Sequence, residues 1–482
     1  MKIRIGSRKS DLAQIQSRLV AAALQRVRPE IEPVFVFKDV GVDLNLTISL
    51  VDAESKGLFT KDLTEDLIQG KVDLLVHSWK DLPTLANAQT EIAATLERED
   101  PRDIVFVKKT SLQKSLITLL SSSPRREFNL GGFLKEYVFQ ESELKFIPIR
   151  GNLPTRIKKF LSSDEDAIVL ALAAVKRLLT HGNEESKEVF QKVLDLSQVV
   201  VVPVVANPPA PAQGALAIEI RKDRADLKEL LSKIKCTQSF ADVIAERERL
   251  KDFGGGCHLK LGIYQKTNAR GVLKVECGLT PGGEKLNSFL WESHRKAPSL
   301  NASEIFDASQ LNVFDRKVLN VEKPQNSSGL FLYVSKSEAL PSEWKIQQKD
   351  ILWTAGLETW KKLRKKGLWV SGSQESLGED YFDFPLELFP SHKAYKLAHM
   401  EGVQKSLPLL ATYELVAKDS QIPDLSTHRA FYWPSGSLFK ACLKKNPQLL
   451  EKLHFCGLGN SFDELSTYLP ADKLFSNSLP RF

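Results

Sequence analysis

The sequence contains few cysteines and no long hydrophobic run. Its five cysteines among 482 residues are widely spaced and odd in number, and they form neither a disulfide framework nor a metal-ligand pattern. The longest apolar runs, residues 167–175 and 199–206, are too short to cross a bilayer and are predicted to be buried strands. The opening residues also lack the apolar core of a signal peptide. These absences favour a cytoplasmic protein without a membrane segment or a bound metal.

The charge balance gives little support to a nucleic-acid partner. A net charge of +7 is a mild excess over this length, and no aromatic–basic interleaving or known nucleic-acid motif accompanies it. The arginines instead gather in short loops beside small residues, in SSSPRR (121–126), RGNLPTR (150–156) and VKR (175–177). Because guanidinium groups pair bidentately with carboxylates and keep their charge, this pattern predicts a small anionic ligand.

The length predicts three or four domains, and the first of them alternates strand and helix signals. A strand over 2–6 precedes a helix, and a second helix over 61–69 precedes a strand over 72–77. Such alternation predicts a mainly parallel sheet that binds ligands in the loops beyond the carboxyl ends of its strands. The polar residues that occupy such loops are Arg8, Ser10, Lys80 and Asp81.

A second α/β unit is predicted to begin near residue 103. The Pro-rich stretch 199–220 then leads into a strand and is predicted to cross back to the first domain. A small α+β unit follows, with a helix over 241–253 and strands over 259–264 and 272–278.

Beyond a polar linker predicted at 323–329, the sequence carries a weak internal repeat. Residues 330–340 and 351–363 form the first copy, and residues 430–442 and 453–465 form the second. Each copy is an apolar strand that ends in small polar residues, followed by a strand that runs through a glycine into a helix. Two Rossmann-like halves are the simplest interpretation.

A lone cysteine, Cys257, follows three glycines, which allow close backbone approach and keep its thiol reachable. A lone cysteine is ordinarily a packing residue, and an aspartate in a turn such as KDLP (80–83) is ordinarily solvated. Taken alone, Cys257 and Asp81 therefore each remain open to a structural and to a functional interpretation. Together with the many arginines, they suit an enzyme that tethers a polyanionic chain and works on it. The remaining cysteines are interpreted as packing residues: Cys236, Cys277, Cys442 and Cys456.

Eight sequence blocks, in collinear order over about the first 300 residues, resemble porphobilinogen deaminase, also called hydroxymethylbilane synthase. They are GSRKSDLA (6–13), KGLFTKDL (56–63), VDLLVHSWKDLPT (72–84), EREDPRD (97–103), SSSPRR, RGNLPTR, QGALAIEIR (213–221), and AERERL (245–250) with GGGC (254–257). The chain departs from the family pattern at Leu120-Ser121, at Pro124, at Pro211-Ala212 and at His258 and Lys260. These departures put the loop around Ser123 and the position of Gln213 in question.

The resemblance implies a covalent dipyrromethane cofactor, one per chain, on Cys257. Four porphobilinogen molecules would be condensed onto it and released as hydroxymethylbilane. Each condensation expels ammonia and leaves an electrophilic azafulvene, so a fixed carboxylate at Asp81 would stabilise the positive charge that arises. Asp43 matches a further acidic position of the family.

The same resemblance assigns the cations, since every pyrrole brings an acetate and a propionate. The cofactor would be held by Lys80, Asp81, Ser123, Arg125 and Arg126. The substrate or growing chain would be held by Arg8, Ser10, Arg150, Arg156 and Arg177. Asn152 is expected to shape its loop.

The C-terminal region, about residues 330–468, resembles a shortened uroporphyrinogen III synthase, an enzyme that inverts ring D of hydroxymethylbilane and closes the macrocycle. Residues 411–416 resemble that family's Tyr-containing strand. Tyr413 and Ser435 are the candidate site residues there, although each alone would ordinarily be a strand tyrosine and a turn serine.

The predicted fold is α/β throughout: two periplasmic-binding-protein-like domains, a small α+β domain with the cofactor cysteine, and a two-lobed Rossmann-like tail. The predicted boundaries are 1–100 with 199–220, 101–198, 221–300, a connecting segment 301–329, and 330–482. A cytoplasmic monomer that acts on porphobilinogen, with no nucleic-acid or membrane partner, is expected.

Three functional hypotheses remain open on the sequence. The chain is an enzyme, either a deaminase alone or a deaminase fused to the synthase. Alternatively it is a solute-binding protein for a small anion, which would need a signal peptide and no Cys257. In a third hypothesis the tail alone is a non-catalytic interaction module.

Overall fold

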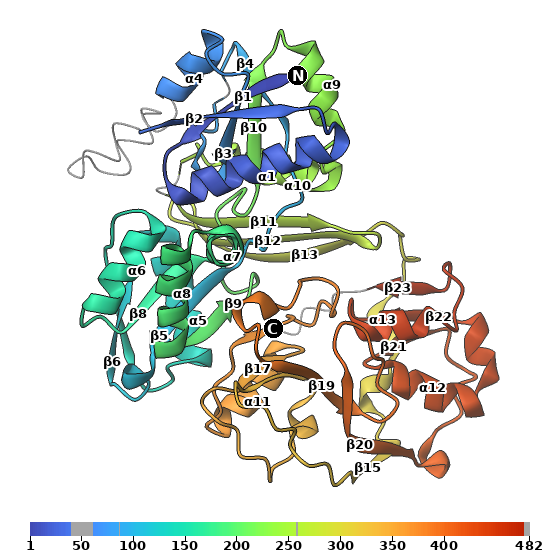
Figure 1. The fold of residues 1–482 in the computed structure, drawn as a ribbon. Helices are drawn as coiled ribbons and strands as arrows, with labels where there is room; N and C mark the ends of the chain where they lie inside the picture. The colour runs from blue at the N-terminus through green and yellow to red at the C-terminus, as the bar shows by residue number, and fades with distance from the viewer. Residues whose placement is uncertain (40–60, 86, 257–258, 477–482) are drawn as a thin grey trace. The chain divides into compact units, whose positions relative to one another are not determined.

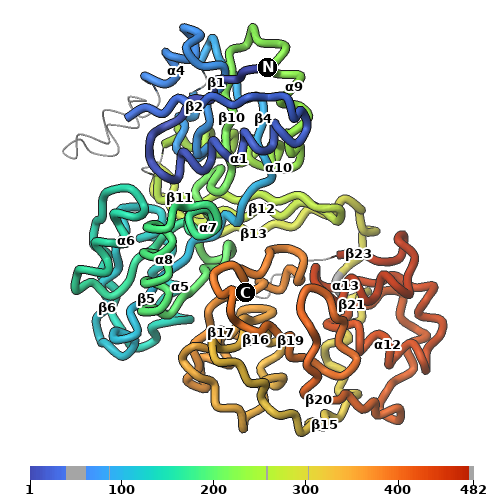
Figure 2. Tube along the Cα trace, viewed as in Figure 1, coloured from blue at the N-terminus to red at the C-terminus, as the bar shows by residue number. Residues whose placement is uncertain are grey.

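The computed structural model describes residues 1–39, 61–85, 87–256 and 259–476 (Figures 1 and 2). The chain divides into two compact units. Unit 1 comprises residues 1–266 and 274–288, and unit 2 comprises residues 267–273 and 289–482. In the part of the chain that the structure describes, no helix is both long enough and apolar enough to cross a membrane.

The first sheet of unit 1 has the strand order β2-β1-β3-β10-β4. Strand β1 is parallel to β2 and β3, whereas β10 is antiparallel to both of its neighbours. The sheet is therefore mixed rather than mainly parallel, because β10 enters it on the return from the second domain. The strands are β1 (Lys2–Arg8), β2 (Glu32–Lys38), β3 (Leu74–Ser78), β4 (Thr90–Ala94) and β10 (Leu216–Arg221).

Helices of this domain cover the sheet with apolar faces. Ile5 of β1, Leu24 of α1 and Leu231 of α9 are buried in one core, as the predicted alternation of strand and helix requires. The helices are α1 (Asp11–Val27), α4 (Lys61–Ile68), α9 (Ala225–Ser232) and α10 (Thr237–Asp252).

The second sheet has the order β7-β6-β8-β5-β9, with β6 parallel to its two neighbours and β5 antiparallel to its own. Because β9 pairs with β5, residues 197–202 belong to this sheet, and the crossover to the first sheet follows them. The strands are β5 (Asp103–Lys108), β6 (Leu116–Leu120), β7 (Glu143–Ile147), β8 (Ala167–Ala171) and β9 (Ser197–Val202).

The apolar run 167–175, predicted to be one strand, divides after Ala171 into β8 and the start of α7. Periodicity alone does not separate a buried strand from a buried helix in so short a run, and almost every side chain of this one is buried. The helices of this domain are α5 (Pro124–Tyr137), α6 (Leu153–Ser162), α7 (Leu172–His181) and α8 (Glu184–Leu196).

A three-stranded sheet follows α10 in the order β11-β12-β13. Its first two strands confirm those predicted near 259–264 and 272–278. A Cβ at Gly278 (φ +144°) would lie 1.9 Å from the carbonyl oxygen of Lys260, so β11 and β12 approach closely because this residue is glycine. The strands are β11 (Lys260–Thr267), β12 (Gly271–Leu279) and β13 (Lys285–Ser293).

Unit 2 contains a six-stranded sheet in the order β15-β20-β19-β16-β17-β18. Its strands are parallel except for β15, which is antiparallel to β20. Strand β17 runs through Gly356 into α11 (Leu357–Lys365), as the repeat predicts. The strands are β15 (Phe314–Val318), β16 (Leu330–Val334), β17 (Ile351–Thr354), β18 (Gly372–Ser373), β19 (Lys393–His399) and β20 (Leu409–Ala417).

The second sheet of unit 2 is parallel, in the order β14-β21-β22-β23. The segment 301–329, predicted as a connection, supplies β14 to this sheet and β15 to the other. Trp433, Phe439 and Leu465 form part of its core. The elements are β14 (Ile305–Asp307), β21 (Ala430–Trp433), α12 (Gly436–Lys445), β22 (Leu453–Cys456), α13 (Asn460–Leu465) and β23 (Leu474–Ser476).

Short 3-10 helices occur in several of the loops of both units. They are η1 (Trp79–Asp81), η2 (Lys109–Ser111), η3 (Ala302–Glu304), η4 (Ala308–Gln310), η5 (Ser337–Ala339), η6 (Leu386–Leu388), η7 (Asp419–Gln421) and η8 (Pro447–Glu451).

Candidate active site

A buried carboxylate, Asp103, organises the arginines at the start of α5. Ser123 is the N-cap of this helix, and its hydroxyl accepts a hydrogen bond from the backbone N–H of Arg126 at 3.4 Å. Pro124 then occupies the first turn, where a missing N–H costs nothing. The departure from the family pattern at Pro124 is thus compatible with a capped helix that presents Arg125 and Arg126 from its first turn.

Both guanidinium groups donate to the same carboxylate. Arg126 is bidentate, with Nη2 at 2.7 Å from Oδ1 of Asp103 and Nε at 3.1 Å from Oδ2, while Nη2 of Arg125 lies 2.9 Å from Oδ2. Asp103 is fully buried, and Arg125 and Arg126 are 4% and 8% exposed. Burial would raise the pKa of Asp103, but the two guanidinium groups hold it well below its usual range. Asp103 is therefore ionised and fixes both arginines.

Lys80 joins Asp103 through Gln213. The amide of Gln213 donates to Oδ1 of Asp103 at 2.9 Å and to the carbonyl of Pro101 at 2.6 Å, and its oxygen accepts from Nζ of Lys80 at 3.1 Å. The preceding Ala212 has φ +67°, and its N–H donates to a buried carboxylate oxygen of Glu246 at 2.7 Å. The turn that departs from the family pattern thus holds Gln213 in the site.

Arg247 of α10 holds the backbone of the KDLP turn in place. Its guanidinium donates to the carbonyls of Trp79, Leu82 and Pro83 at 2.5–3.3 Å. Trp79 is buried, while Asp81 is exposed and accessible to a ligand. The pKa of Lys80 is lowered, first by burial and then by Arg126, although Asp81 opposes the shift.

Arg156 adds a third guanidinium close to the same groups. Asn152 caps α6, accepting from the N–H of Thr155 at 3.0 Å, and Nε of Arg156 donates to the carbonyl of Gly151 at 2.7 Å. Burial lowers the pKa of Arg156, and Arg126 and Arg150 lower it further, while Asp81 raises it. We call this set the Asp103 cluster: Lys80, Asp81, Asp103, Arg125, Arg126, Arg150 and Arg156.

The Asp103 cluster has the charge of a carboxylate-binding site. It holds five cationic and two anionic side chains, and both Lys80 and Arg156 have lowered pKa values, which an anion would reverse. Asp81 offers a carboxylate beside these cations, where it can accept N–H groups or stabilise positive charge.

Known proteins resemble this chain over the part that carries the cluster. Residues 3–229 match the family model "Porphobilinogen deaminase, dipyromethane cofactor binding domain". The porphobilinogen deaminase of Caldicellulosiruptor saccharolyticus is 37% identical over 271 residues, which cover 55% of this chain and 85% of that protein. The chain belongs to the porphobilinogen deaminase family.

A second relative matches a similar share of this chain. The porphobilinogen deaminase of Desulfitobacterium hafniense is 36% identical over 274 residues, covering 56% of this chain and 82% of the relative. Among solved structures, the periplasmic aliphatic sulphonate binding protein SsuA from Escherichia coli is 14% identical with a TM-score of 0.27, covering 53% of this chain and 75% of that one. A TM-score this low assigns neither fold nor function.

The region matched by the deaminase family model binds a dipyrromethane cofactor.

The remaining predicted residues of the deaminase lie at several places. Arg8 is the last residue of β1, and Ser10 immediately precedes α1, so both lie at the carboxyl end of β1. Strand β1 is adjacent to β3, and the KDLP turn follows β3. Arg177 of α7 donates through Nη2 to the carbonyl of Gly214 at 2.6 Å, on the turn that also carries Gln213. Cys257 and Asp43 lie outside the described residues. The roles of all these residues stay predictions.

Three residues that organise the site were not predicted from the sequence: Asp103, Asn207 and Glu246. Asn207 donates to Oδ2 of Asp103 at 2.8 Å and accepts from Nη1 of Arg125 at 2.7 Å. Glu246 is buried and accepts from both terminal nitrogens of Arg98 at 2.6 and 3.0 Å. Asp103 and Glu246 lie in the quoted blocks EREDPRD and AERERL, which were the only available signal.

The two candidate residues of the tail have structural partners. Ser435 is the N-cap of α12 and accepts from the N–H of Leu438 at 3.3 Å. Tyr413 in β20 is buried, with the guanidinium of Arg316 at 4.7 Å from its ring centre. His399 pairs with Tyr413 in register, and its Nε2 lies 3.2 Å from the hydroxyl of Ser437 on α12. His399 therefore links the sheet that carries Tyr413 to the helix that Ser435 caps.

Proposed function

We propose that unit 1 is a hydroxymethylbilane synthase, which condenses four porphobilinogen molecules into hydroxymethylbilane and releases ammonia. The observation that carries the proposal is the Asp103 cluster, in which a buried carboxylate fixes Arg125 and Arg126 beside Lys80. Porphobilinogen carries an acetate and a propionate, which suits this excess of cations. A solute-binding protein would also need cations, but it would need neither Asp81 among them nor a cysteine at position 257.

The dipyrromethane fits the donor set of the cluster, because each of its rings carries two carboxylates. Lys80, Arg126 and Ser123 would hold it, with Cys257 as the point of attachment. Once bound, it supplies the terminal pyrrole carbon at which the chain is extended. Arg125 acts differently, since its donors are directed to Asp103, Asn207 and Pro208, so it positions α5 against the crossover segment.

Asp81 is the proposed catalytic residue. Its carboxylate is exposed on the turn that Arg247 fixes, so it can reach a substrate without rearrangement. When ammonia leaves porphobilinogen, positive charge develops on the pyrrole, and the carboxylate stabilises that charge and accepts the pyrrole N–H. Arg150 and Arg156, with Arg8 and Ser10, would bind the carboxylates of the incoming substrate.

The test is turnover of porphobilinogen by the purified full chain. Asp81→Asn keeps the size of the side chain and removes its charge, so kcat should fall at least ~100-fold. The control is Asp223→Asn, which removes an exposed carboxylate that pairs with Arg221. Cys257→Ala should lose the mass of the covalent cofactor. Full activity of the Asp81 variant, or no product from folded wild-type chain, would refute the proposal.

We further propose that unit 2 is a uroporphyrinogen III synthase that receives the product of unit 1. The specific observation in its favour is His399, which joins the strand of Tyr413 to the helix that Ser435 caps. A titratable side chain at the contact between a sheet and a helix of the other layer is suitably placed for acid–base work on a ligand bound there.

The isomers of the oxidised product test this second function. Porphobilinogen incubated with the full chain should give mainly uroporphyrin III, and His399→Gln should shift the product toward isomer I without slowing its formation. A tail that is only an interaction module would give isomer I from the wild type as well.

Unit 1 and unit 2 are proposed to act in the cytoplasm as one monomer. The described cysteines are free, namely Cys236, Cys277, Cys442 and Cys456, as a reducing compartment requires.

A further inference from the structure

Strand β10 enters the first sheet on its return from the second domain, and its alignment on β3 decides which residues meet at the site. The KDLP turn follows β3, and Gln213 lies in the turn that precedes β10. The backbone N–H of Trp79 donates to the carbonyl of Ala215 at 3.1 Å, and Nζ of Lys80 donates to the amide oxygen of Gln213 at 3.1 Å. Both contacts form in only one register of β10 on β3.

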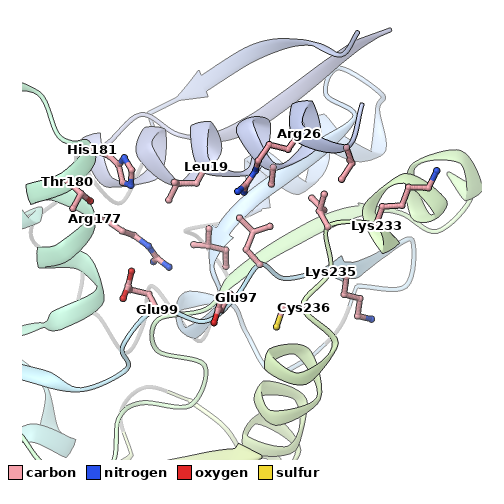
Figure 3. A pocket seen from close by; sticks show the side chains of 15 residues that line it. Leu19, Arg26, Glu97, Glu99, Arg177, Thr180, His181, Lys233, Lys235 and Cys236 are labelled. Carbon is pink, nitrogen blue, oxygen red and sulfur yellow. The ribbon is translucent and has the colours of Figure 1, made fainter. Parts of the chain in front are cut away.

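The hydrophobic pattern of the two strands does not specify this register. Every residue of β10 from Leu216 to Ile220 is buried, and so is every residue of β3 from Leu74 to His77. Because both faces of each strand are covered, a shift by one residue would exchange apolar side chains for apolar side chains at nearly every position. Packing adds little at the start of β10, because Leu216 borders a cavity of about 530 Å³ that Leu19 of α1 also lines (Figure 3). The register therefore needs a polar contact.

His77 and Glu219 provide that contact. Among the buried positions of these two strands, which the structure describes in full, only these two side chains are polar. Nε2 of His77 lies 3.0 Å from Oε2 of Glu219, and the hydroxyl of Thr90 on β4 donates to Oε1 of Glu219 at 2.5 Å. Burial raises the pKa of Glu219, but the hydrogen bonds from His77 and Thr90 outweigh it and keep this pKa below its usual range. The ionised carboxylate only accepts, so Nε2–H of His77 donates to it.

The pair is diagonal across the two strands and is sensitive to their alignment. Ala217 lies opposite His77, and Glu219 is two residues farther along on the same face, within reach of a long side chain. The pairing of β10 with β4 also shifts register between Ile218 and Glu219, and such an irregularity disrupts the ladder locally. A slip of β10 by one residue would turn the carboxylate to the opposite face, into the apolar core that contains Leu24.

We propose that His77 and Glu219 are positioning residues of unit 1, whose pairing sets the register of β10 on β3 and thereby places Gln213 against Lys80. The observed register pairs a buried carboxylate with two donors, whereas a one-residue shift leaves it buried without them. Neither side chain needs to contact a substrate. The effect on turnover rests on the proposed function of unit 1, but the effect on strand pairing does not.

The test compares the full-length wild type with the double variant His77→Leu/Glu219→Leu. Replacing a buried pair by apolar side chains often leaves stability unchanged, so this variant should fold. Amide hydrogen exchange should nevertheless rise at least ~10-fold in residues 74–82 and 214–221, and not in β1 of the same sheet. Porphobilinogen turnover per chain that carries the cofactor mass should fall at least ~10-fold, because Gln213 no longer holds Lys80.

Two milder variants and a control accompany the double variant. Glu219→Gln can still accept from His77 and donate to Thr90, so it should recover most of the lost protection and turnover. Thr90→Val removes one of the two donors to the carboxylate and should raise exchange in the same residues by a smaller factor. The control is Glu91→Gln, which removes a carboxylate of β4 that pairs with the exposed Lys228 and should behave like the wild type.

The proposal is overturned if the folded double variant exchanges or turns over like the wild type, since the pair would then only fill space. It is equally overturned if exchange rises as much in β1, which a general loss of stability would produce. Should the double variant not fold, wild-type exchange in Thr90→Val would overturn it. If the wild type forms no hydroxymethylbilane, the proposed function fails, and hydrogen exchange still decides the role of the pair.

Discussion

The indole Nε1–H of Trp433 donates a hydrogen bond to Nδ1 of His454 at 2.9 Å, and both side chains are fully buried in unit 2. The other ring nitrogen, Nε2, lies 2.7 Å from the carbonyl oxygen of Leu449 and donates to it. Since Nδ1 accepts, the imidazole is held in its neutral form with the proton on Nε2. Burial accordingly lowers the pKa of His454 to about 4.

This depressed pKa makes unit 2 sensitive to acid. Between the ordinary pKa of 6.5 and about 4, the unfolded chain binds a proton at His454 that the folded chain does not, so stability falls as pH falls. The free energy of unfolding should drop by about 3 kcal/mol across this window. Urea unfolding followed by tryptophan fluorescence measures it, because six of the seven tryptophans lie in unit 2.

The matched variant is His454→Gln, whose amide can accept from Trp433 and donate to Leu449 but does not titrate. Its stability should change less with pH over the same window. An acid sensitivity identical to that of the wild type would show that His454 does not cause the effect.

Asp103 is predicted to be indispensable to both stability and turnover. Asp103→Asn removes the one anion between two buried guanidinium groups, and a buried pair broken on one side typically costs about 3–5 kcal/mol. Arg125 and Arg126 would then lose their fixed positions, so porphobilinogen turnover should fall as well. Thermal unfolding and a turnover assay measure the two effects.

Asp223→Asn serves as the control here too, since its ion pair with Arg221 is exposed and contributes little. A stable, fully active Asp103 variant would mean that the two arginines are positioned by other contacts, such as those with Asn207 and Val169.

Much of the fold could be predicted from local patterns, because burial periodicity acts over a few residues. The helix expected over 241–253 corresponds to α10, which begins four residues earlier and ends at Asp252, and both glycine-to-helix elements of the tail occur as α11 and α13. The antiparallel direction of β10 could not be read in this way, because it depends on where the chain re-enters the sheet.

The candidate site, like the fold, contains residues that local sequence patterns predict and residues that they do not. Arg125 and Arg126 were predictable from composition and resemblance, whereas the residue that fixes them was not. Asp103 acquires its role only when α5, the Asn207 segment and the Gln213 turn converge on it, from more than 20 to more than 100 residues away along the chain. Such long-range convergence leaves no periodic signal in a single sequence.

A second acid-sensitive group is predicted in unit 1, at Asp166. Its carboxylate accepts from Nζ of Lys114 at 2.6 Å, from the hydroxyl of Ser111 at 2.7 Å, and from both the N–H and the hydroxyl of Thr118 at 2.8 Å. Burial opposes these hydrogen bonds, but together they lower the pKa of Asp166 to about 2.

A carboxylate with a depressed pKa stabilises the fold above its ordinary value of 3.8 and loses that effect as pH falls toward 2. Asp166→Asn should therefore be less stable than the wild type by about 2 kcal/mol at neutral pH, and the difference should shrink in acid. Thermal unfolding followed by circular dichroism measures it. Asp195→Asn, at an exposed position on α8, should show no such difference, and a pH-independent gap for Asp166→Asn would contradict the assignment.

Arg270 is predicted to be a main stabilising contact of unit 2, although it lies in the turn between β11 and β12. Its Nη1 donates to the carbonyl of Leu458 at 2.6 Å, Nη2 pairs with Asp463, and the guanidinium lies 4.7 Å from the ring centre of Phe462. Asp463 also binds Nζ of Lys405 at 2.5 Å, so removing Arg270 leaves this carboxylate with one cation. Arg270→Ala should lower the free energy of unfolding of unit 2 by about 2 kcal/mol.

Arg270→Lys distinguishes charge from geometry, because an ammonium keeps the charge but cannot reach Leu458 and Asp463 together as a guanidinium fork does. It should recover only part of the loss in urea unfolding followed by tryptophan fluorescence. Lys366→Ala, at an exposed position after α11, should unfold like the wild type. If Arg270→Ala also unfolds like the wild type, the turn between β11 and β12 contributes nothing to unit 2, and α13 is held by its other contacts, such as those of Asp463 with Lys405 and of Glu464 with Lys440.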